Sequence, residues 1–243
     1  MRARPPVPLI SAGFGSIWRL PLVGDDVNGF LFRDPDGQLT LLDVGLRRSA
    51  PAVLAAVSAV GGAPTDVTRI LLTHGHSDHA GSAAELSRRT GREVAAHAAD
   101  AAYLRAGKAT PRSGHGRLVP AAWLGYPPVP VGATLADGDL LDVAGGLRVV
   151  HTPGHTPGHL SFLHEESGLL ITGDSIFNVA GLRWPVRSFC ANFRLTQQTA
   201  ARLGELDYTM AAFTHGPEIR HGARESIRRF LVGDRSRAVG GGT

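Results

Sequence analysis

Short apolar runs and longer segments of helical periodicity alternate along the chain. Short runs rich in Val, Ile, Leu and Phe, bounded by Gly, Pro or Asp, are typical of strands. Such runs occur at Ile17–Leu22, Gly29–Arg33, Leu39–Val44, Arg69–Thr73, Leu160–His164, Leu169–Thr172 and Thr209–Thr214. A further stretch, "LLDVAGGLRVVH", predicts a hairpin, because Gly145 and Gly146 supply the positive φ that a tight turn requires.

Segments in which apolar residues recur at helical spacing predict helices between these strands. They are Ala50–Val60, Ala80–Thr90 closed by Gly91, Asp100–Arg105, Arg194–Leu206 and Ala223–Val232. Strands that alternate with helices favour an α/β fold built in layers, and the hairpins favour mixed rather than purely parallel sheets. No repeat or linker-like stretch divides the chain, so we expect residues 1–243 to form a single domain with a frayed tail at 234–243.

Composition narrows the class of protein. Hydrophobic residues make up 43% of the 243 residues, which is enough for a sizeable core. The net charge is only +4, and the sequence contains no run of basic residues. We therefore expect no nucleic-acid partner. Prolines interrupt the amino-terminal segment, and no apolar run is long enough to span a bilayer. We therefore expect a soluble, cytoplasmic protein without membrane association.

The single cysteine, Cys190, limits the chemistry further. One cysteine excludes an internal disulfide and a cysteine-based structural zinc site. No feature of the sequence pairs Cys190 with a base, so we expect a small buried residue rather than a nucleophile.

The stretch "THGHSDH" at residues 73–79 concentrates side chains that bind metals. On a strand, His74, His76 and Asp78 share one face while His79 points away, and on a helix the first two lie on nearly opposite sides. We therefore expect a tight loop around a metal site, with Asp78 and His79 at the start of the next helix. Because these two neighbours compete for the space around one ion, we predict a second ion beside the one that His74 and His76 bind.

Each ion needs further ligands, since catalytic zinc usually takes three protein ligands and keeps one position open. His155 in "HTPGH", Asp174 in "TGDS" and His215 in "FTHG" each follow a predicted strand, at the end where open α/β sheets place their sites. A single histidine in such a position is usually satisfied by a local hydrogen bond. Packing five histidines and two aspartates together without a metal leaves several polar groups unpaired, so we predict a metal centre.

The blocks "LLDVG", "HGHSDH", "HTPGHTPGH", "TGDS" and "FTHG", in this order from about Asp43 to His215, resemble the metallo-β-lactamase superfamily. The resemblance implies a four-layer αββα sandwich with two mixed β-sheets and a metal centre along one edge. It also implies seven ligands, of which Asp174 binds both ions. The ligands of the first ion are His74, His76 and His155, and those of the second are Asp78, His79 and His215.

The same resemblance implies a metal-dependent hydrolase. Asp43 and His159 are expected to hold the ligands in place without binding metal themselves. Two zinc ions are the expected cofactors, and iron and manganese accept the same ligands. Ions a few ångströms apart share a water and lower its pKa toward about 7, which gives a bridging hydroxide that Asp78 orients for attack. We expect it to cleave an ester, thioester or lactone bond of a small-molecule substrate. The oligomeric state is not predicted.

Members of the same family leave alternatives open. Some hold iron and oxidise persulfides, so a persulfide dioxygenase-like oxidoreductase is one alternative, and hydrolysis of β-lactams as a side activity is another. Glyoxalase II-like thioesterases resemble this chain in the ligand set and in the "GDSIF" block, but carry an additional helical region. Homoserine-lactone lactonases resemble it in ligands, but typically have Tyr where this chain has Phe177.

Two segments, 107–132 and 175–192, fit neither a helix nor a strand, and long loops of this kind are often functional. In the second segment we expect Phe177, Arg183 and Trp184 to contact the substrate, with the arginine binding a carboxylate or phosphate. The alternative is a solvated loop in an arginine-rich protein. In the first segment, Trp123 and Tyr126 are candidates for an apolar wall of the site.

Overall fold

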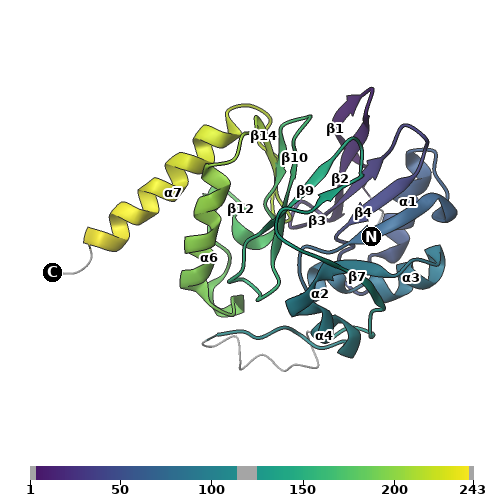
Figure 1. The fold of residues 1–243 in the computed structure, drawn as a ribbon, viewed down its shortest axis with the longest axis horizontal. Coiled ribbons are helices and arrows are strands. Elements are labelled where there is room, and N and C mark those ends of the chain that lie inside the picture. Colours follow the sequence, from purple (N-terminus) through teal and green to yellow (C-terminus); the bar gives the residue numbers. More distant parts are fainter. Residues whose placement is uncertain (1–3, 114–124, 241–243) are drawn as a thin grey trace.

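Two β-sheets packed face to face, with helices on both outer faces, form the centre of the molecule (Figure 1). The computed structural model describes residues 4–113 and 125–240. Helices α1 (Ala50–Ala59) and α3 (Ala83–Thr90) lie on one outer face, and α6 (Phe193–Ala200) and α7 (Ala223–Gly240) lie on the other. This arrangement confirms the predicted four-layer αββα sandwich with two mixed sheets.

The first sheet contains seven strands in the described part of the chain, and each pairs with the next in sequence. They are β1 (Val7–Ala12), β2 (Gly15–Val23), β3 (Val27–Arg33), β4 (Leu39–Leu42), β5 (Val67–Leu71), β6 (Val94–His97) and β7 (Val131–Leu135). Strands β1 to β4 pair antiparallel, and β4 to β7 pair parallel. Parallel neighbours need crossover connections. These contain α1 with η1 (Pro64–Asp66), α2 (Ser77–Ala80) with α3, and α4 (Ala98–Ala106).

The second sheet has the order β14-β11-β10-β9-β8. Its strands are β8 (Leu140–Leu141), β9 (Leu147–His151), β10 (Leu160–His164), β11 (Leu169–Ile171) and β14 (Met210–Ala212). Only the β11–β14 pair is parallel, with Leu170 opposite Ala211. The connection between β11 and β14 contains η3 (Gly173–Ser175), the small hairpin of β12 (Phe177–Asn178) and β13 (Leu182–Arg183), η4 (Arg187–Phe189), α6 and η5 (Ala201–Gly204).

Buried apolar side chains fill the spaces between the layers. In β3, Phe30 and Phe32 pack toward the second sheet, whereas Leu31 between them packs toward α1 and α3. In β10, Phe162 packs toward the first sheet and Leu163 toward α6 and α7. Because successive strand residues point to opposite faces, such continuous apolar runs require a sheet that is covered on both sides.

The predicted strands all form, with ends shifted by two residues at most, and the predicted hairpin is the β8–β9 turn. In that turn Gly145 and Gly146 have φ values of 94° and 136°. Three strands of the first sheet were not predicted. These are β1, which begins among prolines, β6, which is only four residues long, and β7, whose central residues are exposed.

The predicted helix over residues 80–90 is two helices, α2 and α3. A Cβ atom on Gly81 would lie 2.3 Å from the carbonyl oxygen of Ser77 and 2.5 Å from the amide nitrogen of Arg47. The loop after β4 therefore passes directly against the junction, and only glycine allows this approach. As predicted, Gly91 ends α3 in a left-handed conformation, with φ of 73°.

The carboxyl-terminal helix is longer than the sequence pattern predicts. The sequence pattern predicts a helix over Ala223–Val232, whereas the backbone of α7 is helical from Ala223 to Gly240. Residues 234–239 contain no proline or glycine, so nothing in this stretch forces the helix to end. Within the residues described, no helix has both the length and the apolar character needed to cross a membrane.

Candidate metal centre

The seven candidate ligands lie together at one edge of the two sheets. The loop after β5 and the single turn of α2 carry four of them, and the segments after β9, β11 and β14 carry one each. In chain order they are His74, His76, Asp78, His79, His155, Asp174 and His215. The predicted loop is present, and the predicted start of a helix at Asp78 is the first turn of α2.

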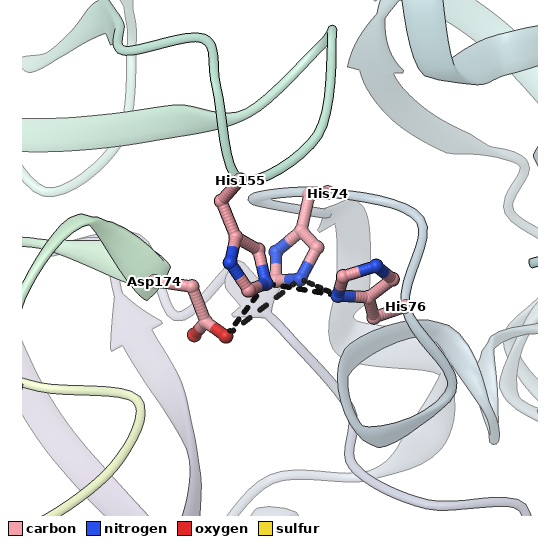
Figure 2. Close-up of side chains that lie close together, drawn as sticks. All are labelled: His74, His76, His155 and Asp174. Atoms are coloured by element: carbon pink, nitrogen blue, oxygen red, sulfur yellow. Dashed lines mark hydrogen bonds and ion pairs between the residues drawn. The ribbon is translucent and has the colours of Figure 1, made fainter. Parts of the chain in front are cut away.

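Four side chains, which we call the first group, point toward one another: His74, His76, His155 and Asp174 (Figure 2). Nδ1 of His76 lies 3.0 Å from Nε2 of His74 and 2.9 Å from Nε2 of His155. Oδ2 of Asp174 lies 3.1 Å from Nε2 of His155 and 3.9 Å from Nε2 of His74. A tetrahedral ion bound at about 2.0–2.2 Å from each ligand holds the ligand atoms about 3.3 Å apart, and the distances in this group run from 2.9 Å to 3.9 Å around that value.

Asp78, His79 and His215 form the second group beside it. Oδ1 of Asp174 lies 3.3 Å from Nε2 of His79 and 3.4 Å from Nε2 of His215. Oδ2 of Asp78 lies 3.7 Å and 3.5 Å from the same two nitrogens. The two oxygens of Asp174 therefore face different groups, as the oxygens of a carboxylate bridging two ions do.

Hydrogen bonding alone does not satisfy these side chains. Nε2 of His79 is buried and has no hydrogen-bond partner among the described residues, although two carboxylates lie within 3.7 Å. Nδ1 of His76 is close to two imidazole nitrogens at once, and one lone pair cannot serve both. Imidazoles with carboxylates are ligands that zinc, iron and manganese accept. The side chains present therefore fit a pair of divalent cations.

The electrostatics of the cluster centre on Asp174. Burial opposes its ionisation, but His215, His79 and His155 together hold the pKa of Asp174 well below its ordinary value. Burial likewise opposes a charge on His155, yet Asp174 raises the pKa of His155 to about 9. The buried carboxylate thus requires positive charge beside it, which either protons or bound cations supply.

Asp43 holds the loop after β5 in place. It is fully buried, and its Oδ2 lies 2.7 Å from Nδ1 of His79. The backbone N–H of Thr73 donates to Oδ1 at 2.8 Å, and the Thr73 hydroxyl donates to Oδ2 at 2.7 Å. A carboxylate at Nδ1 sets the tautomer of a histidine and directs Nε2 toward a metal. This is the geometry that the expected bracing role of Asp43 requires.

His159 acts on Asp174 through the backbone. The Asp174 N–H donates to Nε2 of His159 at 2.7 Å, and Nδ1 of the same ring lies 2.9 Å from the Thr152 hydroxyl. Burial and the neighbouring His155 lower the pKa of His159 to about 3, so the ring is neutral and Nε2 can accept. His159 therefore fixes the backbone of η3 that carries Asp174, and it takes no place among the clustered donor atoms.

Asp100, in the first turn of α4, joins the two loops of the first group, and sequence reasoning missed it. The N–H of Gly75 donates to Oδ2 at 2.9 Å and the N–H of Gly158 donates to Oδ1 at 2.8 Å. The Thr156 hydroxyl donates to Oδ2 at 2.7 Å. An acidic residue in the first turn of a helix ordinarily indicates a favourable interaction with the helix dipole, so the sequence carried no signal for this role.

Cys190 is buried as expected, and it also contacts a candidate ligand. Its Sγ lies 3.5 Å from Nδ1 of His155. The backbone on either side reinforces the contact, since the N–H of Ala191 donates to the carbonyl of His155 at 2.9 Å. The end of segment 175–192 is therefore fixed to the loop that carries His155.

A cavity of about 440 Å³ opens onto both groups. Its walls are largely apolar, and its apolar lining residues are Val27, Leu46, Ala109, Phe177, Val186 and Phe189. Both unassigned segments contribute to the walls. Tyr126 instead braces the ligand loop, because its hydroxyl donates to the carbonyl of Gly75 at 2.7 Å. Trp123 lies outside the described residues.

The structure separates the three predicted substrate contacts. Phe177 lines the cavity, with its ring centroid 4.3 Å from that of His215. Trp184 packs against Phe230, at 4.7 Å between ring centroids, in the apolar layer below α7. Arg183 is exposed on β13, and neither it nor Trp184 is among the described residues that line the cavity. Arg183 pairs with Phe177 across the β12–β13 hairpin, and the contacts of Arg183 and Trp184 with a substrate stay a prediction.

Comparisons with known proteins agree with this architecture. A family model described as metallo-beta-lactamase superfamily matches residues 22–215. The probable metallo-hydrolase YybB of Bacillus subtilis is 28% identical over 207 residues, which are 85% of this chain and 87% of YybB. A solved structure, Rm3 metallo-beta-lactamase, has a TM-score of 0.70 and 25% identity, over 98% of this chain and 95% of Rm3.

A hydroxyacylglutathione hydrolase of Cereibacter sphaeroides is 36% identical over 159 residues, which are 65% of this chain. This chain matches only 50% of that protein, so it spans about half the length of this relative. The family model covers most of the chain, including the loops that carry all seven candidate ligands. The chain therefore belongs to the metallo-beta-lactamase superfamily.

Proposed function

We propose that this protein is a metal-dependent hydrolase that uses two zinc ions to cleave an ester, thioester or lactone bond of a small molecule. The division of Asp174 between the two groups carries this proposal, because its Oδ1 and Oδ2 face different sets of imidazoles. When bound, a pair of ions supplies a nucleophile at neutral pH and polarises the carbonyl group that is attacked.

Side chains of the protein hold the ions, keep the loops in position and transfer protons. The first group and the second group would each hold one ion, and Asp43, Asp100 and His159 keep the loops in position. Asp78 lines the cavity, as several of the other candidate ligands do, but its side chain is more exposed than theirs, at 32% against 14% for His215. Its carboxylate can hold a proton on Oδ and pass it to a leaving group in the cavity.

The names of the relatives support a hydrolytic reaction, but they do not define which bond this protein cleaves. YybB is named a probable metallo-hydrolase, and the Cereibacter protein is named a hydroxyacylglutathione hydrolase. The second name is that of a thioesterase. Because this chain matches only half of that protein, we carry over the type of reaction and not its glutathione-containing substrate.

A hydrolysis screen tests the proposal. The full chain is freed of metal, reloaded separately with zinc, manganese or iron, and assayed with thioesters, lactones, aryl esters, a chromogenic β-lactam and a phosphodiester. We expect turnover of at least one thioester, ester or lactone by the zinc-loaded protein, and loss of that turnover in D78A. Purified protein that contains iron and consumes oxygen with a persulfide would contradict the proposal, and would favour the oxidoreductase alternative.

A further inference from the structure

The cavity above the two groups holds one arginine in a largely apolar wall. Among the described residues that line it, Arg112 carries the only guanidinium, and the neighbouring wall residues include Ala109, Val186 and Phe189. Arg112 belongs to segment 107–132, in which the sequence showed no candidate for substrate binding apart from two aromatic residues.

Backbone contacts place Arg112 on the side of the first group. The N–H of the next residue, Ser113, donates to the carbonyl of Cys190 at 2.8 Å, and Cys190 in turn contacts His155. Two residues earlier, Thr110 is buried and packs over Gly75, where an added Cβ atom would lie 3.0 Å from Thr110 Cγ2. Segment 109–113 is therefore anchored to both loops that carry the histidines of the first group.

The lining of the cavity beside the second group is apolar. Phe177 lies against His215, and Val27 and Leu46 continue this apolar lining. A substrate in the cavity therefore meets an apolar surface near the second group and a cationic side chain near the first. At about 440 Å³ the cavity has the size of a small-molecule site.

The guanidinium of Arg112 is partly withdrawn from water. Burial lowers the pKa of Arg112 from its ordinary value, although arginine stays charged at any physiological pH. A charge in a wall of low polarity interacts more strongly with an anion than the same charge in water does. A planar guanidinium also matches a carboxylate with two parallel hydrogen bonds.

We propose that the substrate is an ester or thioester with an apolar body that carries a carboxylate, and that Arg112 binds this carboxylate. This inference rests on the proposed function and defines its substrate class. Arg112 acts in selection: it holds one end of the substrate while the bond to be cleaved lies over the ligand cluster. The neutral analogue of the same substrate lacks this contact and is expected to be the poorer substrate.

Two matched pairs of esters test the inference with the zinc-loaded full chain. In the first pair the acyl group differs: phenyl hexanoate against the monophenyl ester of hexanedioic acid. In the second pair the leaving group differs: phenyl hexanoate against para-carboxyphenyl hexanoate. We expect the carboxylate member of at least one pair to have the higher kcat/KM. In R112Q we expect this preference to fall by about tenfold to a hundredfold, the loss that follows removal of one charged hydrogen-bonding partner.

Three further variants sharpen the result. R112K keeps the charge without the planar fork and should retain part of the preference. R88Q removes an exposed arginine from α3, outside the cavity, and R183Q removes the exposed arginine on β13. Both should keep the wild-type preference. The zinc content of R112Q should equal that of the wild type, which separates a substrate contact from damage to the metal centre.

The outcomes distinguish this inference from the proposed function. If none of the three esters, and no other ester, thioester or lactone of the screen, is hydrolysed by the zinc-loaded chain, both proposals fail. If neutral esters are hydrolysed but neither pair shows a preference for the carboxylate, the inference alone is overturned. A preference that R112Q leaves intact, or that R183Q removes instead, also overturns it.

Discussion

The two ligand groups differ in burial and in support. In the first group the side chains of His74, His155 and Asp174 are at most 4% exposed. Asp100 joins its two loops, and Cys190 contacts the outer nitrogen of His155. The second group combines the buried His79 with two partly exposed side chains at the cavity, Asp78 at 32% and His215 at 14%.

This difference indicates that the two groups have different functions. A buried and well-braced site binds an ion tightly, because little reorganisation accompanies binding. A site with exposed ligands at the cavity exchanges its ion more readily and meets the substrate directly. We therefore expect the first ion to be the more tightly held and the second to be the more sensitive to substrate and chelators.

The largest effect is expected from D174A, which removes the difference between the groups by damaging both. Asp174 offers one oxygen to each group, so its loss should lower the affinity for both ions. Turnover should fall at least about a thousandfold, since ions at such sites supply several kcal/mol of transition-state stabilisation. Metal content per chain, measured by atomic emission after dialysis, provides the check. A variant that keeps both ions would show that Asp174 does not bridge.

Removing one histidine from either group should cause loss of the ion that this group binds, while the other ion stays bound. H215A should lose the second ion, keep the first, and lose about a hundredfold or more in turnover. H76A should lose the first ion. Stepwise titration with a chelator, followed by metal analysis, compares them. If each variant loses both ions together, the two groups form one cooperative site. That result would contradict the expected difference in affinity between the two groups.

The braces offer a finer test. D100N replaces one carboxylate oxygen with an amide N–H₂, which cannot accept from both Gly75 and Gly158. We expect affinity for the first ion to fall about tenfold to a hundredfold, with the second ion little changed. D43N should weaken binding of the second ion more than of the first, since Asp43 contacts Nδ1 of His79 directly and reaches the first group only through Thr73. Calorimetric zinc titration of the two variants measures both constants, and equal losses in both variants would contradict separate bracing.

The smallest effect is expected at the cavity wall. F177A removes the ring beside His215 and about 1.5–3 kcal/mol of apolar contact with a bound substrate, so KM should rise about tenfold or more while zinc content stays constant. V186A alters a residue that is 57% exposed at the cavity and should change KM less than threefold, as expected for about 0.5 kcal/mol. A larger effect at Val186 than at Phe177 would place the substrate on the other wall.

The sequence predicted which candidate ligands cluster better than it predicted the cavity walls, and the reason is physical. Ligand side chains such as His155 and Asp174 follow apolar strands in short, recognisable blocks, so each appears as a local pattern. Asp100 shows no such pattern, because its three hydrogen bonds are to loops distant in sequence. Its role exists only in the folded protein.

The walls come from separate loops without periodicity, so the sequence does not show which side chains line the cavity. An aromatic residue in a loop has the same local sequence whether it faces a cavity, as Phe177 does, or an apolar core, as Trp184 does. The local sequence likewise does not distinguish Arg112 from Arg183, because both are arginines in segments without periodicity. Only the folded chain shows that Arg112 lines the cavity. Apolar patterning over many residues gives a stronger signal than any single side chain, and it predicted an α/β fold with mixed sheets. The four-layer αββα arrangement was implied by the resemblance of the sequence blocks to the family.

The central claim is that hydrolysis depends on both ligand groups being filled. The most direct measurement adds zinc in steps to metal-free protein and follows bound zinc and turnover of a thioester or ester together. We predict binding of two zinc ions per chain, a tight one followed by a weaker one, with turnover rising chiefly during the second step. Binding that saturates at one zinc per chain with full turnover would contradict the account.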